Sequence, residues 1–244
     1  MGIQHPYPVL SIKWREVAKE FGLALDALED VRAHGNRGAE TLLKAWTSVL
    51  YRGAEYVEAL ERHVTRPLKA GFKMPRTLDR ALSEQCNVLK HDAGRVGFFE
   101  AKAVYTKVVG YQIQHLRGDS LGPVEALHKR RSAYSFNLEM RRQLANLLVA
   151  GDLAAEAIRV AFNEPALPAH KGRFGLGERV LALPLFVFPS ESKEAIPLLR
   201  KTDDGAILVK NSGGTAIPLL GVSLQLTATF TADGFTRQFA LPMA

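Results

Sequence analysis

The chain changes the period of its hydrophobic pattern once, near residues 165–168, and this change constrains the fold more than any other feature. Before it, apolar residues recur every three or four positions, which is typical of amphipathic helices. After it, short β-branched and apolar runs alternate with turn sequences such as TDDG, NSGG and ADG. The pattern predicts an α+β fold: an N-terminal helical bundle (residues 1–165) followed by a small antiparallel β-rich region (residues 166–244).

Four segments of the first region carry the helical period, and the first two are expected to form a helical hairpin. Ser11 is expected to cap the first helix, and Gly35 ends it with a residue that tolerates a positive φ. The four helices are predicted over residues 11–34, 39–64, 77–89 and 135–162.

The stretch at residues 95–117 interrupts the helical region. Aromatic and β-branched residues there fall mainly on odd positions, which is strand periodicity. A β-hairpin inserted in the bundle is therefore expected, although no clear two-residue turn divides the stretch and a further helix stays an alternative. In the C-terminal region, the clearest hairpin signal is Ala-Asp-Gly at residues 232–234.

Composition excludes several classes of protein. Hydrophobic residues make up 47% and charged residues 23%, as in a globular rather than a disordered chain. Cys86 is the single cysteine, which excludes an internal disulfide and a multi-cysteine zinc site. We expect it to be a buried helix residue, and we expect no metal site and no cofactor. The N-terminus lacks a signal-peptide pattern and the longest apolar run is too short to cross a bilayer, so a cytoplasmic protein without membrane contact is expected.

The net charge is +7, which favours an anionic partner such as RNA or an acidic protein. A run of basic residues, LHKRRS at 127–132, concentrates part of this charge. Lys129, Arg130 and Arg131 are candidates for gripping phosphates. The alternative interpretation is a solvated loop that precedes the next helix.

The sequence SEQCNVLKHDAGR at residues 83–95 ends the predicted third helix. Glu84, Asn87 and His91 are three and four residues apart and so share one helix face, where they could support acid–base chemistry or orient a phosphate. The alternative is purely structural. Lys90 and His91 complement the negative end of the helix dipole, and Gly94 supplies a positive-φ stop.

A helix that ends in Asn87-x-x-x-His91 resembles the terminal helix motif of HEPN proteins, which are small helical bundles and often ribonucleases of toxin–antitoxin or antiviral systems. The family motif has an arginine before the polar residue, and Cys86 occupies that position here. The resemblance implies an RNA-facing cleft lined by Asn87, Lys90 and His91, and a homodimer. The missing arginine puts metal-independent RNA cleavage in doubt.

Two functional hypotheses follow. The first is a non-catalytic interaction protein that binds a protein or nucleic-acid partner. The second is a HEPN-like ribonuclease or RNA-binding effector. In the second, Glu84, Asn87 and His91 would be catalytic, and Lys90 with the basic run at residues 129–131 would bind RNA.

Overall fold

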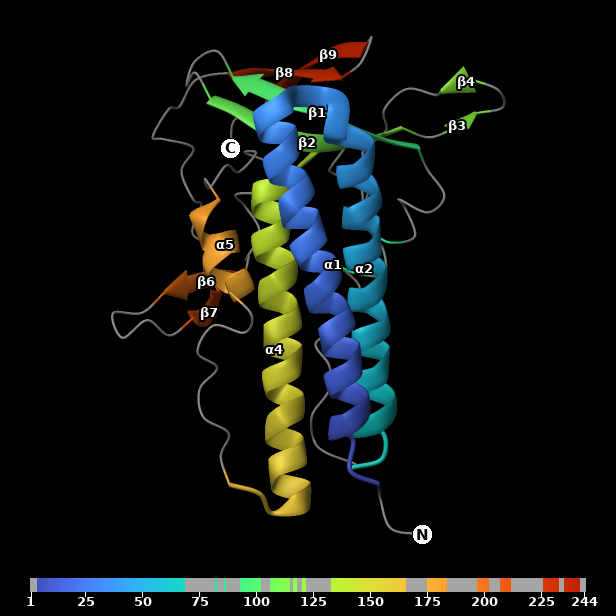
Figure 1. The fold of residues 1–244 in the computed structure, drawn as a ribbon, viewed down its shortest axis with the longest axis vertical. Coiled ribbons are helices and arrows are strands. Elements are labelled where there is room, and N and C mark those ends of the chain that lie inside the picture. The colour runs from blue at the N-terminus through green and yellow to red at the C-terminus, as the bar shows by residue number, and fades with distance from the viewer. Residues whose placement is uncertain are drawn as a thin grey trace.

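Three long helices lie side by side, and a sheet crosses the end at which the first helix passes into the second (Figure 1). The computed structural model describes residues 4–68, 82, 86, 93–101, 106–114, 116–117, 120–121, 133–165, 175–183, 197–201, 207–211, 226–232 and 235–241. Its helical elements are α1 (Tyr7–His34), η1 (Gly35–Gly38), α2 (Ala39–Leu60), η2 (Glu61–Thr65), α4 (Phe136–Phe162) and α5 (Leu176–Ala182). Its strands are β1 (Ala93–Ala101), β2 (Thr106–Gln114), β3 (Leu116–Arg117), β4 (Ser120–Leu121), β5 (Ala133–Ser135), β6 (Pro197–Lys201), β7 (Ile207–Asn211), β8 (Leu226–Ala232) and β9 (Phe235–Leu241).

α1 and α2 form the predicted helical hairpin. α1 ends at His34 as predicted, because Gly35 adopts a φ of 78° and its amide donates to the Val31 carbonyl. The predicted start is wrong: the helix begins at Tyr7, ahead of Ser11. Pro8 lies in the first turn, where its missing N–H removes no intrahelical hydrogen bond.

Trp46 of α2 joins the three long helices. Its side chain is fully buried, and the rings of Phe21 from α1 and Phe136 from α4 both meet it edge-on with centroids 6.0 Å away. Edge-to-face contacts of this kind contribute beyond the apolar area that they bury. The core of the bundle is therefore built around one aromatic cluster.

The sheet has the strand order β5-β2-β1-β8-β9, and each neighbouring pair is antiparallel. β1 pairs with β2 over its whole length, where the sequence predicts a hairpin, and β8 pairs with β9, the strand that follows it in the chain. α2 contacts β1 and α4 contacts β2, whereas β8 and β9 contact chiefly β1 and each other. Val109 of β2 belongs to the core.

The predicted fold class is wrong. Helices account for 89% of the residues whose side-chain surroundings the structure defines, so the described protein is mostly helical and is not a β-rich α+β fold. The residues Arg179–Ala182, which fall in the region expected to be β-rich, lie in α5. β8 and β9 complete a sheet with β1, β2 and β5 instead of building a region of their own. Short apolar runs fit a buried helix turn as well as a strand, because periodicity does not separate the two over so few residues.

Candidate functional site

The residues predicted to be catalytic or to bind nucleic acid lie outside the described residues. They are Glu84, Asn87, Lys90, His91, Lys129, Arg130 and Arg131. Their neighbour Cys86 is described: it is helical, and its side chain is buried in the core, as the sequence predicts. If the HEPN resemblance holds, a buried cysteine stands where the motif has its arginine.

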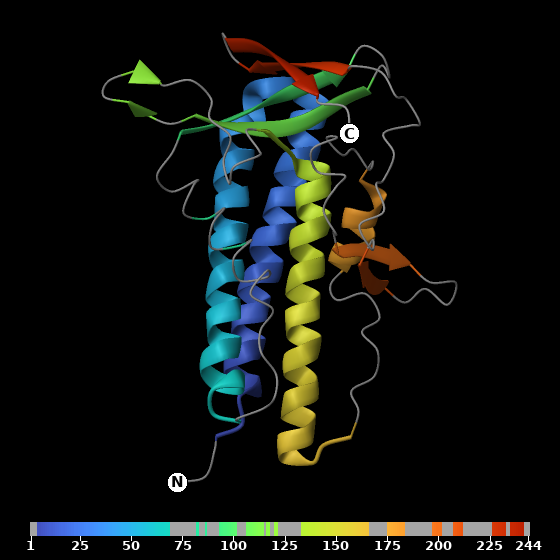
Figure 2. The same cartoon turned by 180° about the vertical axis from the view of Figure 1, so that it is seen from behind.

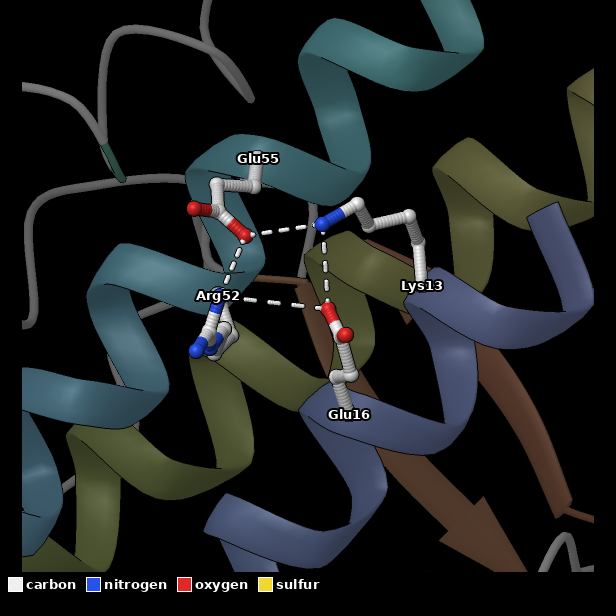
Figure 3. A network of polar contacts seen from close by, with 4 residues as sticks. All are labelled: Lys13, Glu16, Arg52 and Glu55. Carbon is white, nitrogen blue, oxygen red and sulfur yellow. Dashed lines mark hydrogen bonds and ion pairs between the residues drawn. The ribbon is translucent and has the colours of Figure 1, made fainter. Parts of the chain in front are cut away.

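Four charged residues form a closed network across the contact between α1 and α2 (Figure 3). Lys13 of α1 donates from Nζ to Glu16 Oε2 and to Glu55 Oε2, at 3.1 Å in each case. Arg52 of α2 donates from Nη1 to Glu55 Oε2 at 2.8 Å and lies 3.9 Å from Glu16 Oε2. The side chains are 28–40% exposed, so solvent screens them only partly.

The contacts within the network favour the charged forms of Lys13, Arg52 and Glu55. Hydrogen bonds to Glu16 and Glu55 raise the pKa of Lys13, and a hydrogen bond to Glu55 raises the pKa of Arg52. Burial raises the pKa of Glu55, but hydrogen bonds from Arg52 and Lys13 outweigh burial, and the net shift is downward. Two cations and two anions cancel, and none of these shifts brings a group toward neutrality. The network therefore ties α1 to α2 and is poorly suited to proton transfer.

The first half of α4 buries four polar side chains that sequence reasoning missed. Asn137, Glu139, Gln143 and Asn146 are buried, and Glu139 lies 3.7 Å from Arg142 on the same helix. Asn146 Nδ2 donates to Gln143 Oε1 at 3.3 Å. Buried carboxylates and amides are uncommon, and they specify how a helix seats in its surroundings when they are hydrogen-bonded. The sequence does not indicate that these side chains are buried, because polar residues in a helix normally predict its solvent-exposed face.

α5 is held from two sides by arginines. Arg179 of α5 donates from Nη2 to Asp26 Oδ1 at 2.8 Å and to Glu29 Oε1 at 3.0 Å, both on α1. Arg141 of α4 donates from Nη2 to the carbonyl of Leu181 at 2.8 Å and also to the carbonyl of Leu183. Burial lowers the pKa of Arg141. Burial also lowers the pKa of Arg179, but its bonds to Glu29 and Asp26 outweigh burial and raise it.

Apolar burial supplies only part of the free energy that holds α5 in place. Leu176, Val180 and Leu183 are buried, and full burial of such side chains contributes about 1.5–3 kcal/mol each. Ordering the backbone of a seven-residue helix costs about 1–2 kcal/mol per residue. Burial of the three side chains therefore contributes about 4.5–9 kcal/mol against a backbone cost of about 7–14 kcal/mol, so the hydrogen bonds of α5 and its contacts with Arg141 and Arg179 must add to apolar burial.

Charge is distributed unevenly between the helices and the strands. The described helical elements contain 12 Lys and Arg and 13 Asp and Glu. The described strands contain seven basic residues and one acidic residue, Glu100. The basic residues are Arg95, Lys107, Arg117, Arg200, Lys201, Lys210 and Arg237. Residues 69–135, which link α2 to α4 and contain β1–β5, account for +6 of the net charge of +7.

Comparison of the chain with known protein families, with characterised proteins and with solved structures finds no match. Among the described residues, no helix combines the length and the hydropathy that crossing a membrane requires. The same residues contain no group of three or more His, Cys, Asp or Glu placed to hold a metal ion.

Proposed function

We propose that this protein is a non-catalytic RNA-binding protein and that its strands provide the RNA-binding surface. The observation that carries the proposal is the charge distribution: seven basic residues and one acidic residue in the strands, against near balance in the helices. Three of the basic residues, Arg95, Lys107 and Arg237, lie in the five-stranded sheet, and the other four lie in the two small sheets β3-β4 and β6-β7. A positive region attracts an anionic polymer and gains affinity by releasing the counterions of that polymer.

The strand register favours RNA over an acidic protein. Phe99 of β1 is level with Phe230 of β8, and Phe230 is level with Arg237 of β9. Sheets that bind single-stranded RNA combine aromatic rings, on which bases stack, with cations that contact phosphates.

The two described carboxylates with shifted pKa values, Glu55 and Glu156, are poor candidates for general acid–base catalysis. Glu55 and Glu156 have lowered pKa values: hydrogen bonds from Arg52 and Lys13 outweigh burial for Glu55, and a hydrogen bond from Arg159 is the main cause for Glu156. Such carboxylates stay ionised at neutral pH. General acid–base catalysis works best with a pKa near the working pH.

The test is fluorescence anisotropy with a labelled single-stranded 20-mer of uridine, titrated with the full chain between 50 and 200 mM NaCl. Four phosphate contacts predict that affinity falls about 50-fold over this range. Absence of binding at 50 mM NaCl would refute the proposal. Equal binding of poly-glutamate would favour an acidic protein partner instead.

Variants locate the surface. Arg237→Glu should weaken RNA binding about tenfold, because it removes a phosphate contact and adds repulsion. Lys19→Glu makes the same charge change on an exposed position of α1 and should have a small effect. RNA recovered from the mixture should be intact. Cutting that disappears in His91→Ala would instead support the HEPN-like ribonuclease.

A further inference from the structure

α5 contacts both α1 and α4, beside the part of α4 that leads to the sheet (Figures 1 and 2). One stripe of this short helix is buried: Leu176, Val180 and the following Leu183 are at most 5% exposed. These positions are four and seven residues from the first, which is the spacing of one helix face. The buried side of α5 is therefore apolar, and α5 contacts α1, α4 and β6.

A helix of seven residues does not form alone in water, because nucleation outweighs so few hydrogen bonds. The helical state of α5 consequently depends on docking. In this respect α5 resembles a peptide that becomes an amphipathic helix only when it binds to a protein surface.

The polar contacts of α5 give the docking its specificity. Arg179 reaches two carboxylates of α1, and these carboxylates, on Asp26 and Glu29, are 65% and 60% exposed. Arg141 of α4 binds carbonyls at the C-terminal end of α5, where a helix leaves its last acceptors unsatisfied. The contact of Arg179 with its carboxylates is exposed to solvent and is therefore weakened by salt. The contact of Arg141 with the carbonyls fixes the direction in which α5 lies.

We propose that the sides of α1 and α4 that α5 contacts, the α5 docking face, form a binding site for a short amphipathic helix, and that α5 occupies this site as a releasable segment. The face recognises apolar residues at the first, fifth and eighth positions and an arginine at the fourth, as in Leu176, Arg179, Val180 and Leu183. α5 leaves the face as a unit while the long helices stay folded. This inference is independent of RNA binding.

Hydrogen exchange followed by mass spectrometry on the full chain tests the release of α5. Arg179→Glu places a third negative charge beside Asp26 and Glu29, so exchange at residues 175–183 should become about tenfold faster, while residues 39–60 keep their rates. Asp26→Lys with Glu29→Lys in the same chain should restore slow exchange. Arg159→Glu is the matched control, because Arg159 pairs only with Glu156 one turn away among the described residues. Unchanged exchange at residues 175–183, or equal acceleration in α2, overturns the proposal.

A peptide test shows whether the docking face is a binding site. A fluorescein-labelled peptide of residues 175–183 is added to the Arg179→Glu chain, whose own α5 is loosened. Saturable binding that weakens at 1 M NaCl, and that is at least tenfold weaker to the wild-type chain, is expected. The same peptide with Glu at the arginine position should not bind. Absence of saturable binding, or equal binding of both peptides, refutes the docking face.

Discussion

Replacing Glu55 by Gln tests the network between α1 and α2 most directly. The substitution keeps the shape of the side chain but removes the negative charge that Arg52 and Lys13 share at 2.8 and 3.1 Å. Partly exposed ion pairs contribute about 0.2–1 kcal/mol each, and the two cations are left with Glu16 alone. We therefore expect the free energy of unfolding at pH 7 to fall by about 1–1.5 kcal/mol. For a chain of this length that corresponds to a lowering of Tm by roughly 3–5 °C.

The effect of Glu55→Gln should depend on pH in a defined direction. The folded protein lowers the pKa of Glu55 below its ordinary value of 4.5, because bonds from Arg52 and Lys13 outweigh burial. A carboxylate of this kind stabilises the fold fully above the unfolded pKa, and the stabilisation is lost as pH falls through the folded pKa. The difference between wild type and variant should therefore persist at pH 5–7 and shrink below pH 4.5.

The assay is urea unfolding at a series of pH values, followed by circular dichroism. Glu58→Gln is the matched control, because Glu58 is an exposed carboxylate on the same helix and has no ion pair among the described contacts. A difference that is equally large at pH 7 and pH 3, or an equal cost for Glu58→Gln, would refute the reasoning.

Two further predictions concern the core. Trp46→Ala should lower the free energy of unfolding by about 3–5 kcal/mol, because it opens a cavity between Phe21 and Phe136; a loss below 2 kcal/mol by urea unfolding would contradict this. Gly53→Val should lower the free energy of unfolding by about 1–3 kcal/mol, because a Cβ at this position would lie 3.1 Å from Leu82 Cδ2. Gly22→Ala should raise it by about 0.5–1 kcal/mol, because a Cβ at Gly22 meets nothing within 4 Å and alanine favours the helix more than glycine does. Urea unfolding should therefore show a loss of stability for Gly53→Val and a gain for Gly22→Ala.

Much of the helical bundle follows from the sequence. The ends of α1 at His34 and of α4 at Phe162, and the start of α2 at Ala39, agree with predictions from periodicity and from Gly35. These helices are long enough for their apolar faces to repeat several times. A repeated pattern constrains the structure in a way that a single short run does not.

The interior of α4 was harder to predict. Periodicity assigns Leu153 and Val160 to the apolar face, but they are 37% and 65% exposed. Glu139 and Gln143 are instead buried, in a helix that contacts α2, α5, β2, β5 and β6. Hydrophobic pattern reports how a helix divides between a core and water. Where neighbouring elements enclose a helix, polar side chains are buried too, so the hydrophobic pattern no longer shows which residues are buried.

The candidate site shows a similar limit. The network of Lys13, Glu16, Arg52 and Glu55 depends on which turn of α1 lies beside which turn of α2, and the charges on each helix alone do not fix that register. The docking of α5 brings Arg179 to carboxylates about 150 residues away. Contacts over such separations depend on the complete fold.

The distribution of charge explains why the net charge of +7 pointed to a partner without locating it. The described helices neutralise much of their own charge through contacts such as Lys13 with Glu16, Arg159 with Glu156 and Arg179 with Asp26. The described strands supply one acidic residue for seven basic ones, so their positive charge is open to acidic residues elsewhere in the chain, to dissolved salt ions or to a bound polyanion. If neutralisation were internal, added salt would affect RNA affinity little and Arg237→Glu would resemble Lys19→Glu. A steep salt dependence together with a large difference between these two variants would mean that the neutralising charge comes from the RNA.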